Sequence, residues 1–536
     1  MDERDPLPVD TGRGFSLLYR ESYLYSRRDP EAAPELAASR TAMLPDTLYL
    51  VPSPCLCHGL RTLVAALPAS SAVLCVELEE PLAVVAAQAG RDLFVVGGRA
   101  ALVPARDPGT VVARALALGS FRRVVSVRLS QGWKLHAQDY EAMARAIEDE
   151  LSLSWRNRMT LVRMGRLWAR NLLSNLAAMP WDDVEPLTPV VAPLVVCGAG
   201  PSLAAVLPWM REHRRGLHLM AVDTAVGSLA MAGLVPDTVV CLEGQAHNLR
   251  DFVPLSGAPV GLIADVSAHP ASFHVVRGRK SLLSSAWVDC GLLRRLGAAG
   301  LPIVTVPPLG SVGVLALYVA KLVARGPVFV SGLDFMFTPG ATHCPGSPAD
   351  RDESLRESRL YRRARGWAAS YGAGARSAGA GRLSDPALEM YARLASEVSA
   401  GACFMDLRGG FGAPLPLEPM DEGDAAALVE RYASSGSGSV PTAAPVEPAG
   451  CRAIAHAFLS SELELAEELR STLRGAGGTR GLGDLVGLCD YMYAHFPDPD
   501  RVRALELDAL KRLAAEASYW VGRLEDALAT SDGATR

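Results

Sequence analysis

The sequence is poor in lysine and lacks the paired cysteines of a zinc site. Its lysines are Lys134, Lys280, Lys321 and Lys511. Arginine supplies nearly all the positive charge, and the net charge of the 536 residues is −5. Proteins that bind nucleic acid usually carry a strongly basic surface, so nucleic acid is not an expected partner. The ten cysteines are scattered and form no CxxC pair, which favours reduced thiols in a cytoplasm and no bound metal.

Long apolar runs are also missing. The longest such run, residues 312–323, includes Lys321 and is too short to span a bilayer, which takes about 20 apolar residues. The amino terminus, MDERDPLPVD, is acidic and polar, unlike a signal peptide. We therefore expect a cytoplasmic protein with no membrane span, in which residues 312–323 form a buried helix.

Short apolar runs alternate with helical sequence in the first third of the chain. The runs lie at 48–52, 72–76, 93–96 and 124–127. Such alternation is typical of a parallel α/β unit. A helical stretch over about 140–176 follows and leads into a proline-rich joint, 180–193. The pattern predicts an N-terminal segment, 1–45, and a small α/β domain, 46–180.

A second α/β block predicts a central domain over residues 190–415. Its short apolar runs lie at 193–197, 217–222, 238–242, 260–264, 303–306 and 328–330. Runs of this length without strict alternation are typical of strands buried on both faces, so we expect a Rossmann-like parallel sheet. Residues 433–450 are rich in Gly, Ser and Pro and have the composition of a linker. Apolar residues at three- and four-residue intervals beyond it predict a helical C-terminal domain, 451–536.

A glycine-containing turn follows the first run of the central domain. It contains Gly198, Gly200, Pro201 and Ser202 and precedes a predicted helix. Glycine lets the backbone approach a ligand closely, and the first amides of a helix lack internal partners and carry partial positive charge. The turn is therefore a candidate phosphate site, with Ser202 as a helix cap or a further phosphate ligand. It lacks the lysine of a P-loop and the third glycine of the dinucleotide fingerprint, and an ordinary tight turn explains it equally well when taken alone.

Acidic residues follow the next two strands. Asp223 and Thr224 end the second run, and Glu243 ends the third. Open α/β sheets bind ligands at the carboxyl ends of their strands, where a carboxylate can accept hydrogen bonds from a ribose or a base. These three residues are candidate nucleotide-binding residues.

Two later segments complete the candidate site. They contain Gly310, Ser311, Gly313, Gly332, Asp334, Thr342 and His343. The first three begin the apolar helix and offer a second group of free helix amides. The others follow the last strand of the block, again at a carboxyl end.

Five stretches, taken in order, resemble the central domain shared by motility accessory factors and the archaeal MptE-like pterin diphosphokinases. They are VVCGAGPSL, AVDTAVGSLAMAGLVPDTVVCLE, GSVGVLALYVAKL, VFVSGLDFMF and GATHCPG. Upstream, YLYSRRDPEAA also resembles the motility factors, so the resemblance covers about 15–415 and is strongest over 190–346. The pattern is similar, too, to bacterial sialyltransferases that use CMP-activated sugars.

The resemblance implies a glycosyltransferase that moves a nonulosonic, sialic-acid-like sugar from a CMP-sugar donor to Ser or Thr of flagellin or a related protein. The phosphate would lie over 198–202 and 310–313, with Asp223 and Glu243 holding ribose or cytosine. Asp334 would orient the sugar or the catalytic base. His343 is the candidate base, because the pKa of histidine lies near cellular pH.

Three residues depart from the related patterns. Glu243 replaces the family's usual Asp, Cys344 replaces a small residue after Thr-His, and Asp223 replaces the Asn of the sialyltransferases. These changes bear on base recognition and on any metal requirement. Two alternatives stay open. One is an MptE-like diphosphokinase that moves pyrophosphate from ATP to 6-hydroxymethyl-dihydropterin, with Mg²⁺ on acids such as Asp223, Glu243 or Asp334. The other is a non-catalytic flagellin-binding protein.

Overall fold

The computed structural model describes residues 5–362, 365–372, 374–434, 447–476 and 478–534. The chain divides into two compact units, Met1–Thr160 and Leu161–Arg536, and the helix α5 (Ala137–Ala178) contains the division between them. In the described ranges no helix is long and apolar enough to cross a membrane.

In the first unit, a small antiparallel sheet precedes a parallel one. The antiparallel sheet contains β1 (Leu7–Asp10), β2 (Phe15–Tyr19) and β3 (Ser22–Tyr23), and α1 (Ala32–Arg40) follows it. The parallel sheet, in the order β6-β5-β4-β7, contains β4 (Thr47–Pro52), β5 (Ala72–Glu77), β6 (Ala100–Pro104) and β7 (Arg123–Ser126). The intervening helices are α2 (Leu60–Ala65), α3 (Glu80–Ala89) and α4 (Pro108–Leu118). The predicted small α/β fold is confirmed.

One predicted strand of this sheet is wrong. Residues 93–96 form turns, with Val95 and Val96 exposed, and the strand beside β5 is β6 instead. In β6, Ala101 and Val103 are buried against the sheet. An apolar run alone does not identify a strand. The backbone amides of a strand must also bond to a neighbouring strand, as those of β6 do with β5.

The second unit contains a larger parallel sheet. Among the described residues it has nine strands in the order β13-β12-β11-β10-β9-β8-β14-β17-β18, all paired in parallel. They are β8 (Leu194–Cys197), β9 (His218–Val222), β10 (Thr238–Cys241), β11 (Gly261–Asp265), β12 (Lys280–Ser285), β13 (Ile303–Val306), β14 (Val328–Ser331), β17 (Phe404–Asp406) and β18 (Glu418–Pro419). The expected Rossmann-like sheet is confirmed.

The sequence reading missed β12. This strand begins at a lysine and carries three serines, so it does not look like a buried strand. Lys280 is nevertheless buried, because its Nζ lies 2.9 Å from a carboxylate oxygen of Asp183. The ion pair allows a charged residue to begin an interior strand, next to the edge strand β13.

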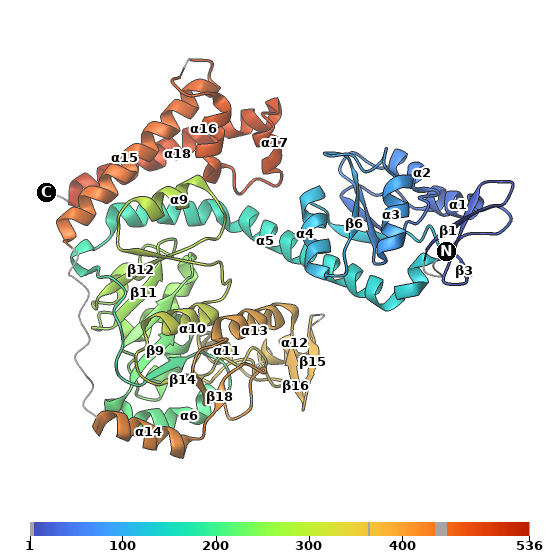
Figure 1. Cartoon of the computed structure of the whole chain (residues 1–536). Helices are drawn as coiled ribbons and strands as arrows, with labels where there is room; N and C mark the ends of the chain where they lie inside the picture. The colour runs from blue at the N-terminus through green and yellow to red at the C-terminus, as the bar shows by residue number, and fades with distance from the viewer. Residues whose placement is uncertain (1–4, 363–364, 373, 435–446, 477, 535–536) are drawn as a thin grey trace. The chain divides into compact units, whose positions relative to one another are not determined.

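Helices cover both faces of this sheet (Figure 1). One face packs against α10 (Val312–Val323) and α13 (Pro386–Ser399). The opposite face packs against α6 (Leu203–Glu212), whose Trp209 contacts Phe329 of β14, and against the end of α5, α9 (Gly291–Ala298) and the C-terminal helices α15 (Pro448–Leu473), α16 (Leu482–Leu488), α17 (Pro499–Arg503) and α18 (Leu507–Ala534). In β10, alternate residues face the two layers. Val239 belongs to the second, for example, and Val240 to the first.

Shorter elements follow the strands and build the loops of the carboxyl edge. They are α7 (Val226–Met231), the 3₁₀ segment η5 (Ala246–Leu255), α8 (Ser272–Val275), α11 (Pro348–Arg356), α12 (Arg365–Ser370), β15 (Arg376–Gly379) and β16 (Arg382–Ser384). After β18, α14 (Glu422–Ser434) buries Ala425 and Val429 in the same cluster as β8 and β9. The predicted linker, 433–450, lies mostly in 435–446, outside the described residues.

The C-terminal helices are joined to the sheet layer by charge as well as by apolar contact. Arg295 of α9 donates from Nε and Nη2 to both carboxylate oxygens of Glu462, at 2.6 and 2.8 Å. Glu462 is buried, so the paired geometry compensates for the loss of its hydration. Asp490 accepts the amide of Gly291 at 2.9 Å and thereby caps the start of α9.

Two buried asparagines on α5 hold the loops after β10 and β11. The side-chain amide of Asn171 donates to the carbonyls of Gly244 and Ser267, at 2.9 and 3.2 Å. One turn later, Asn175 donates to the carbonyls of Val266 and Ala268, both at 2.8 Å. Each asparagine satisfies two loop carbonyls that are shielded from water, so α5 fixes the carboxyl edge of the sheet.

Replacing Asn171 with Ala is therefore expected to destabilise the second unit by about 1–3 kcal/mol, because two buried carbonyls lose their donor. Urea unfolding followed by circular dichroism measures the change. Arg163→Ala, at an exposed position of the same helix, is the matched control and should have little effect. Equal stabilities of the Asn171→Ala and control variants would contradict this role.

Candidate functional site

The sheet of the second unit reverses its strand order beside β8. From β8 the chain adds β9, β10, β11, β12 and β13 on one side, and then crosses back to place β14 on the other. Loops that leave the carboxyl ends of β8 and β14 therefore run toward opposite faces. Open α/β sheets bind ligands in the crevice outside such a switch point.

Two glycines join the loops at this point. The amide of Gly198 donates to the carbonyl of Ser331 at 2.8 Å, and that of Gly200 to the carbonyl of Gly332 at 2.7 Å. A Cβ at either Gly198 or Gly332 would lie 2.2 Å from the carbonyl oxygen of the other. Gly332 also has a left-handed φ of +69°. Only glycine fits this contact, which we call the glycine joint.

A side-chain bond closes the glycine joint. The amide of Ser202 donates to one carboxylate oxygen of Asp334 at 2.9 Å, and its hydroxyl donates to the other at 2.5 Å. The same hydroxyl accepts the amide of Gly332 at 3.0 Å. Asp334 is buried, and burial raises the pKa of its carboxyl group above the ordinary value. Gly200 has no room for a side chain, because a Cβ there would lie 2.4 Å from Asp334 Oδ2.

This geometry corrects the expected source of phosphate donors. The sequence predicts free amides at residues 198–202, but the amides of Gly198, Gly200 and Ser202 all donate within the glycine joint. Pro201 has no amide hydrogen, and the Ser202 side chain makes no helix cap. The pairing uses acceptors far along the chain, which local sequence does not reveal. Whether these residues contact a ligand stays a prediction.

The start of α10 meets the glycine joint through one leucine. A Cβ at Gly198 would lie 2.5 Å from Leu333 Cδ2, and one at Gly313 would lie 2.7 Å from the same atom. The two glycine turns therefore converge, with the Leu333 side chain between them. Gly310 has a φ of +65°, and the Ser311 hydroxyl caps α10 by accepting the amide of Gly313 at 3.3 Å.

The loop after β14 lies across the joint. The amide of Cys344 donates to the carbonyl of Ala199 at 2.8 Å, and Cys344 is buried. A Cβ at Gly227 in α7 would lie 2.3 Å from the carbonyl oxygen of Gly346. His343 is exposed beside this anchor, with its Nδ1 3.0 Å from the Thr342 hydroxyl.

Carboxylates gather on the other side of the switch point. Asp223 is buried at the end of β9 and accepts the amide of Thr224 at 2.7 Å. Burial, with the nearby charges of Asp251 and Glu243, raises the pKa of Asp223 to about 7. Glu243 accepts the amide of Gln245 at 3.1 Å. In the described part of the chain, no three His, Cys, Asp or Glu side chains are placed to hold a metal ion.

Two side chains near the site were not predicted. Arg408, buried after β17, donates to the carbonyls of Leu333 and Ala413 at 3.1 Å and pairs with Asp406 at 2.7 Å. Its bond to the carbonyl of Leu333 fixes the loop after β14. Asp251 lies in η5, where HNLRDF gives no local sign that its carboxylate is buried. Both roles depend on contacts that form only in the folded chain.

Known proteins are similar to this chain over different spans. Residues 170–340 match the family described as 6-hydroxymethylpterin diphosphokinase MptE-like. An uncharacterized protein of Treponema pallidum (strain Nichols) is 28% identical over 548 aligned residues, which cover 96% of this chain and 94% of that protein. A second uncharacterized protein of the same strain is 32% identical over 100 residues, 18% of this chain and 48% of its own length.

A solved structure extends the likeness to nearly the whole chain. The structure of MAf glycosyltransferase from Magnetospirillum magneticum AMB-1 has a TM-score of 0.56 and 12% sequence identity, and covers 98% of this chain and 89% of that chain. At this identity the likeness establishes the fold. The chain thus contains an MptE-like domain, and the resemblance read from its motifs is confirmed.

Gly198→Ala is expected to cost about 3 kcal/mol, because its nearest neighbour is a backbone carbonyl that cannot move aside. Gly522→Ala is the matched control. It lies inside α18 with open space at its Cβ, so alanine there should stabilise by about 0.5–1 kcal/mol. Denaturant unfolding measures both changes, and a neutral Gly198→Ala variant would contradict the joint.

Stability should fall as the pH rises from about 4 to 7. The folded state keeps a proton on Asp223 up to its raised pKa of about 7, whereas the unfolded chain releases it near 4. The folded state therefore binds more protons in this window, and raising the pH favours unfolding. Asp223→Asn removes this contribution and should flatten the decline in thermal midpoint between pH 5 and 7. An unchanged slope would contradict the assigned pKa.

Proposed function

We propose that this protein is a glycosyltransferase that moves a nonulosonic, sialic-acid-like sugar from a CMP-sugar to Ser or Thr of flagellin or a related protein. The observation that carries the proposal is the glycine joint at the switch point, crossed by the loop that bears His343. The likeness of nearly the whole chain to the structure of a MAf glycosyltransferase supports it.

The start of α10 is the strongest phosphate site that the fold offers. The joint uses the amides of Gly198, Gly200 and Ser202, but the first-turn amides of Val312 and Val314 have no partner within their helix. The positive end of the helix dipole adds to them. As the bond from sugar to phosphate breaks, negative charge grows on the phosphate, and donors fixed beside it stabilise the transition state.

The Asp223 side chain is suited to hydrogen bonding with the nucleoside part of a CMP-sugar. Its raised pKa of about 7 leaves a proton on the carboxyl group near neutral pH, so the group both donates and accepts a hydrogen bond. The asparagine that sialyltransferases carry at this position has the same capacity. In this proposal Asp223, Thr224 and Glu243 bind the ribose or the cytosine.

His343 is the proposed general base. Its loop is anchored to Ala199 through Cys344, while its own side chain is exposed to an incoming acceptor. The imidazole would take the proton from a Ser or Thr hydroxyl as the oxygen attacks the anomeric carbon and CMP leaves. Asp334 contributes as a positioning residue, because Ser202 occupies both its oxygens.

An MptE-like diphosphokinase is the second candidate. The family match over residues 170–340 favours it. In that reaction the α10 amides would bind ATP phosphates, and acidic residues such as Asp223 or Glu243 would hold Mg²⁺. Asp334 fits this role poorly, because both its oxygens accept hydrogen bonds from Ser202.

Nucleotide stabilisation separates these candidates. CMP at a hundred times its Kd should stabilise the protein by about 2.7 kcal/mol, visible as a higher thermal midpoint, while ATP with Mg²⁺ should not. The reverse result supports the diphosphokinase. Capture of flagellin with no response to either nucleotide supports a non-catalytic binding protein and contradicts the proposed transfer.

Replacing His343 with Ala should abolish sugar transfer and leave the CMP-induced shift unchanged, because the side chain acts on the acceptor. Transfer is measured by the intact mass of flagellin incubated with CMP-N-acetylneuraminic acid or another CMP-nonulosonic acid. Near-normal transfer by His343→Ala would remove this residue from the mechanism.

A further inference from the structure

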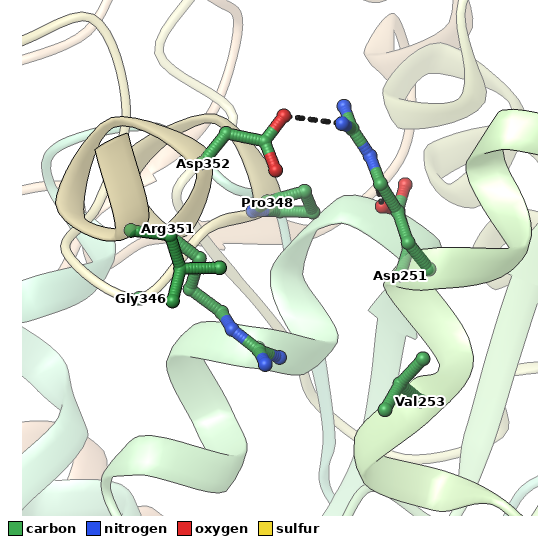
Figure 2. Close-up of a pocket in the computed structure, with 9 residues that line it drawn as sticks. Asp251, Val253, Gly346, Pro348, Arg351 and Asp352 are labelled. Atoms are coloured by element: carbon green, nitrogen blue, oxygen red, sulfur yellow. Dashed lines mark hydrogen bonds and ion pairs between the residues drawn. The ribbon is translucent and has the colours of Figure 1, made fainter.

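A pocket of about 130 Å³ lies beside the candidate site, between α7, η5 and α11 (Figure 2). Gly227 and Gly346 form part of its wall, and both belong to the loops that meet at the carboxyl edge of the sheet. Gly346 stands three residues beyond His343, and Gly227 stands four residues beyond Asp223. A ligand in the pocket would therefore adjoin the proposed reaction site.

Asp251 lines this pocket and has a buried oxygen with an unmet hydrogen bond. Only 4% of the residue is exposed, and its Oδ1 has no hydrogen-bond partner among the described residues. The nearest cation is Nε of Arg250, at 3.6 Å, beyond hydrogen-bond range. Burying an acceptor without a donor is costly, so a ligand hydroxyl or N–H would be favoured there.

The two arginines of the pocket differ in what they contact. Arg250 forms an ion pair with Asp352, drawn as the dashed line in Figure 2. Arg351 is exposed, its guanidinium has no hydrogen bond or ion pair among the described residues, and it points away from the Arg250–Asp352 pair. An unpaired guanidinium presents a planar fork of donors that matches a carboxylate.

The charge balance of the pocket favours a carboxylate over a phosphate. Two arginines face two aspartates, Asp251 and Asp352, so the wall has little net charge when both acids are ionised. A doubly charged phosphate would carry one negative charge more than the guanidinium of Arg351 can balance. A singly charged ligand that also carries hydroxyl or amide donors satisfies both Arg351 and Asp251.

We propose that this pocket binds the carboxylate end of an acidic sugar, with the carboxylate on Arg351 and a neighbouring hydroxyl or acylamino N–H on Asp251. The assignment rests on the proposed function and adds the residues that select an acidic donor sugar. A neutral sugar of the same size would leave Arg351 without its anion, so the pocket would discriminate against it.

The direct test titrates free N-acetylneuraminic acid into the full-length protein and follows binding by saturation-transfer NMR. Arg351→Ala should weaken binding about tenfold or more, and the methyl ester of the sugar should bind the unmodified protein with a similar loss. Arg356→Ala, an exposed arginine on the same helix outside the pocket, is the matched control and should bind normally. Asp251→Ala, which removes the acceptor oxygen, tests the second contact and should also weaken binding.

Absence of binding by the unmodified protein would overturn the inference. So would equal affinity in the Arg351→Ala variant, or an ester that binds as well as the acid. Measuring the CMP-induced thermal shift on the same samples separates the two proposals. If CMP raises the thermal midpoint normally but the Arg351→Ala variant binds the sugar as tightly as the unmodified protein, only this inference is contradicted. If Arg351→Ala weakens sugar binding but CMP does not change the thermal midpoint, only the proposed use of a CMP-sugar donor is contradicted.

Discussion

The close approach of Gly198 and Gly332 is the contact on which the candidate site depends. It brings the ends of β8 and β14 together at the point where the strand order reverses, and it leaves no space for a Cβ on either residue. The bond from Ser202 to Asp334 closes it from one side, and Arg408 holds the loop from the other. Because the joint fixes these loops, the start of α10 and the loop of His343 have a rigid base.

Positive and negative groups lie on opposite sides of the glycine joint. On one side lies the amino end of α10, with free amides and the positive end of the helix dipole. On the other lie Asp223, Glu243 and Asp251, where mutual repulsion and burial keep a proton on Asp223 near neutral pH. A nucleotide-sugar, with a phosphate between a nucleoside and a polyhydroxyl sugar, matches this division of positive and acidic groups.

The sequence predicted the sheet well because its strands are buried on both faces and its helix amphipathic patterns are strong. The α10 run is an example, since most of its apolar side chains are buried in the core. Prediction failed where partners are distant. Lys280 begins an interior strand only because Asp183 pairs with it, and the amides of Gly198, Gly200 and Ser202 donate to Ser331, Gly332 and Asp334. Likewise, nothing near Asp251 in the sequence indicates that its carboxylate lies buried in a pocket wall.

A crystal structure with a non-hydrolysable CMP-sugar tests the account most directly. The account predicts the phosphate within hydrogen-bond distance of the Val312 and Val314 amides, with the nucleoside toward Asp223. A nucleotide bound elsewhere on the chain, or a phosphate that contacts neither amide of α10, would contradict it.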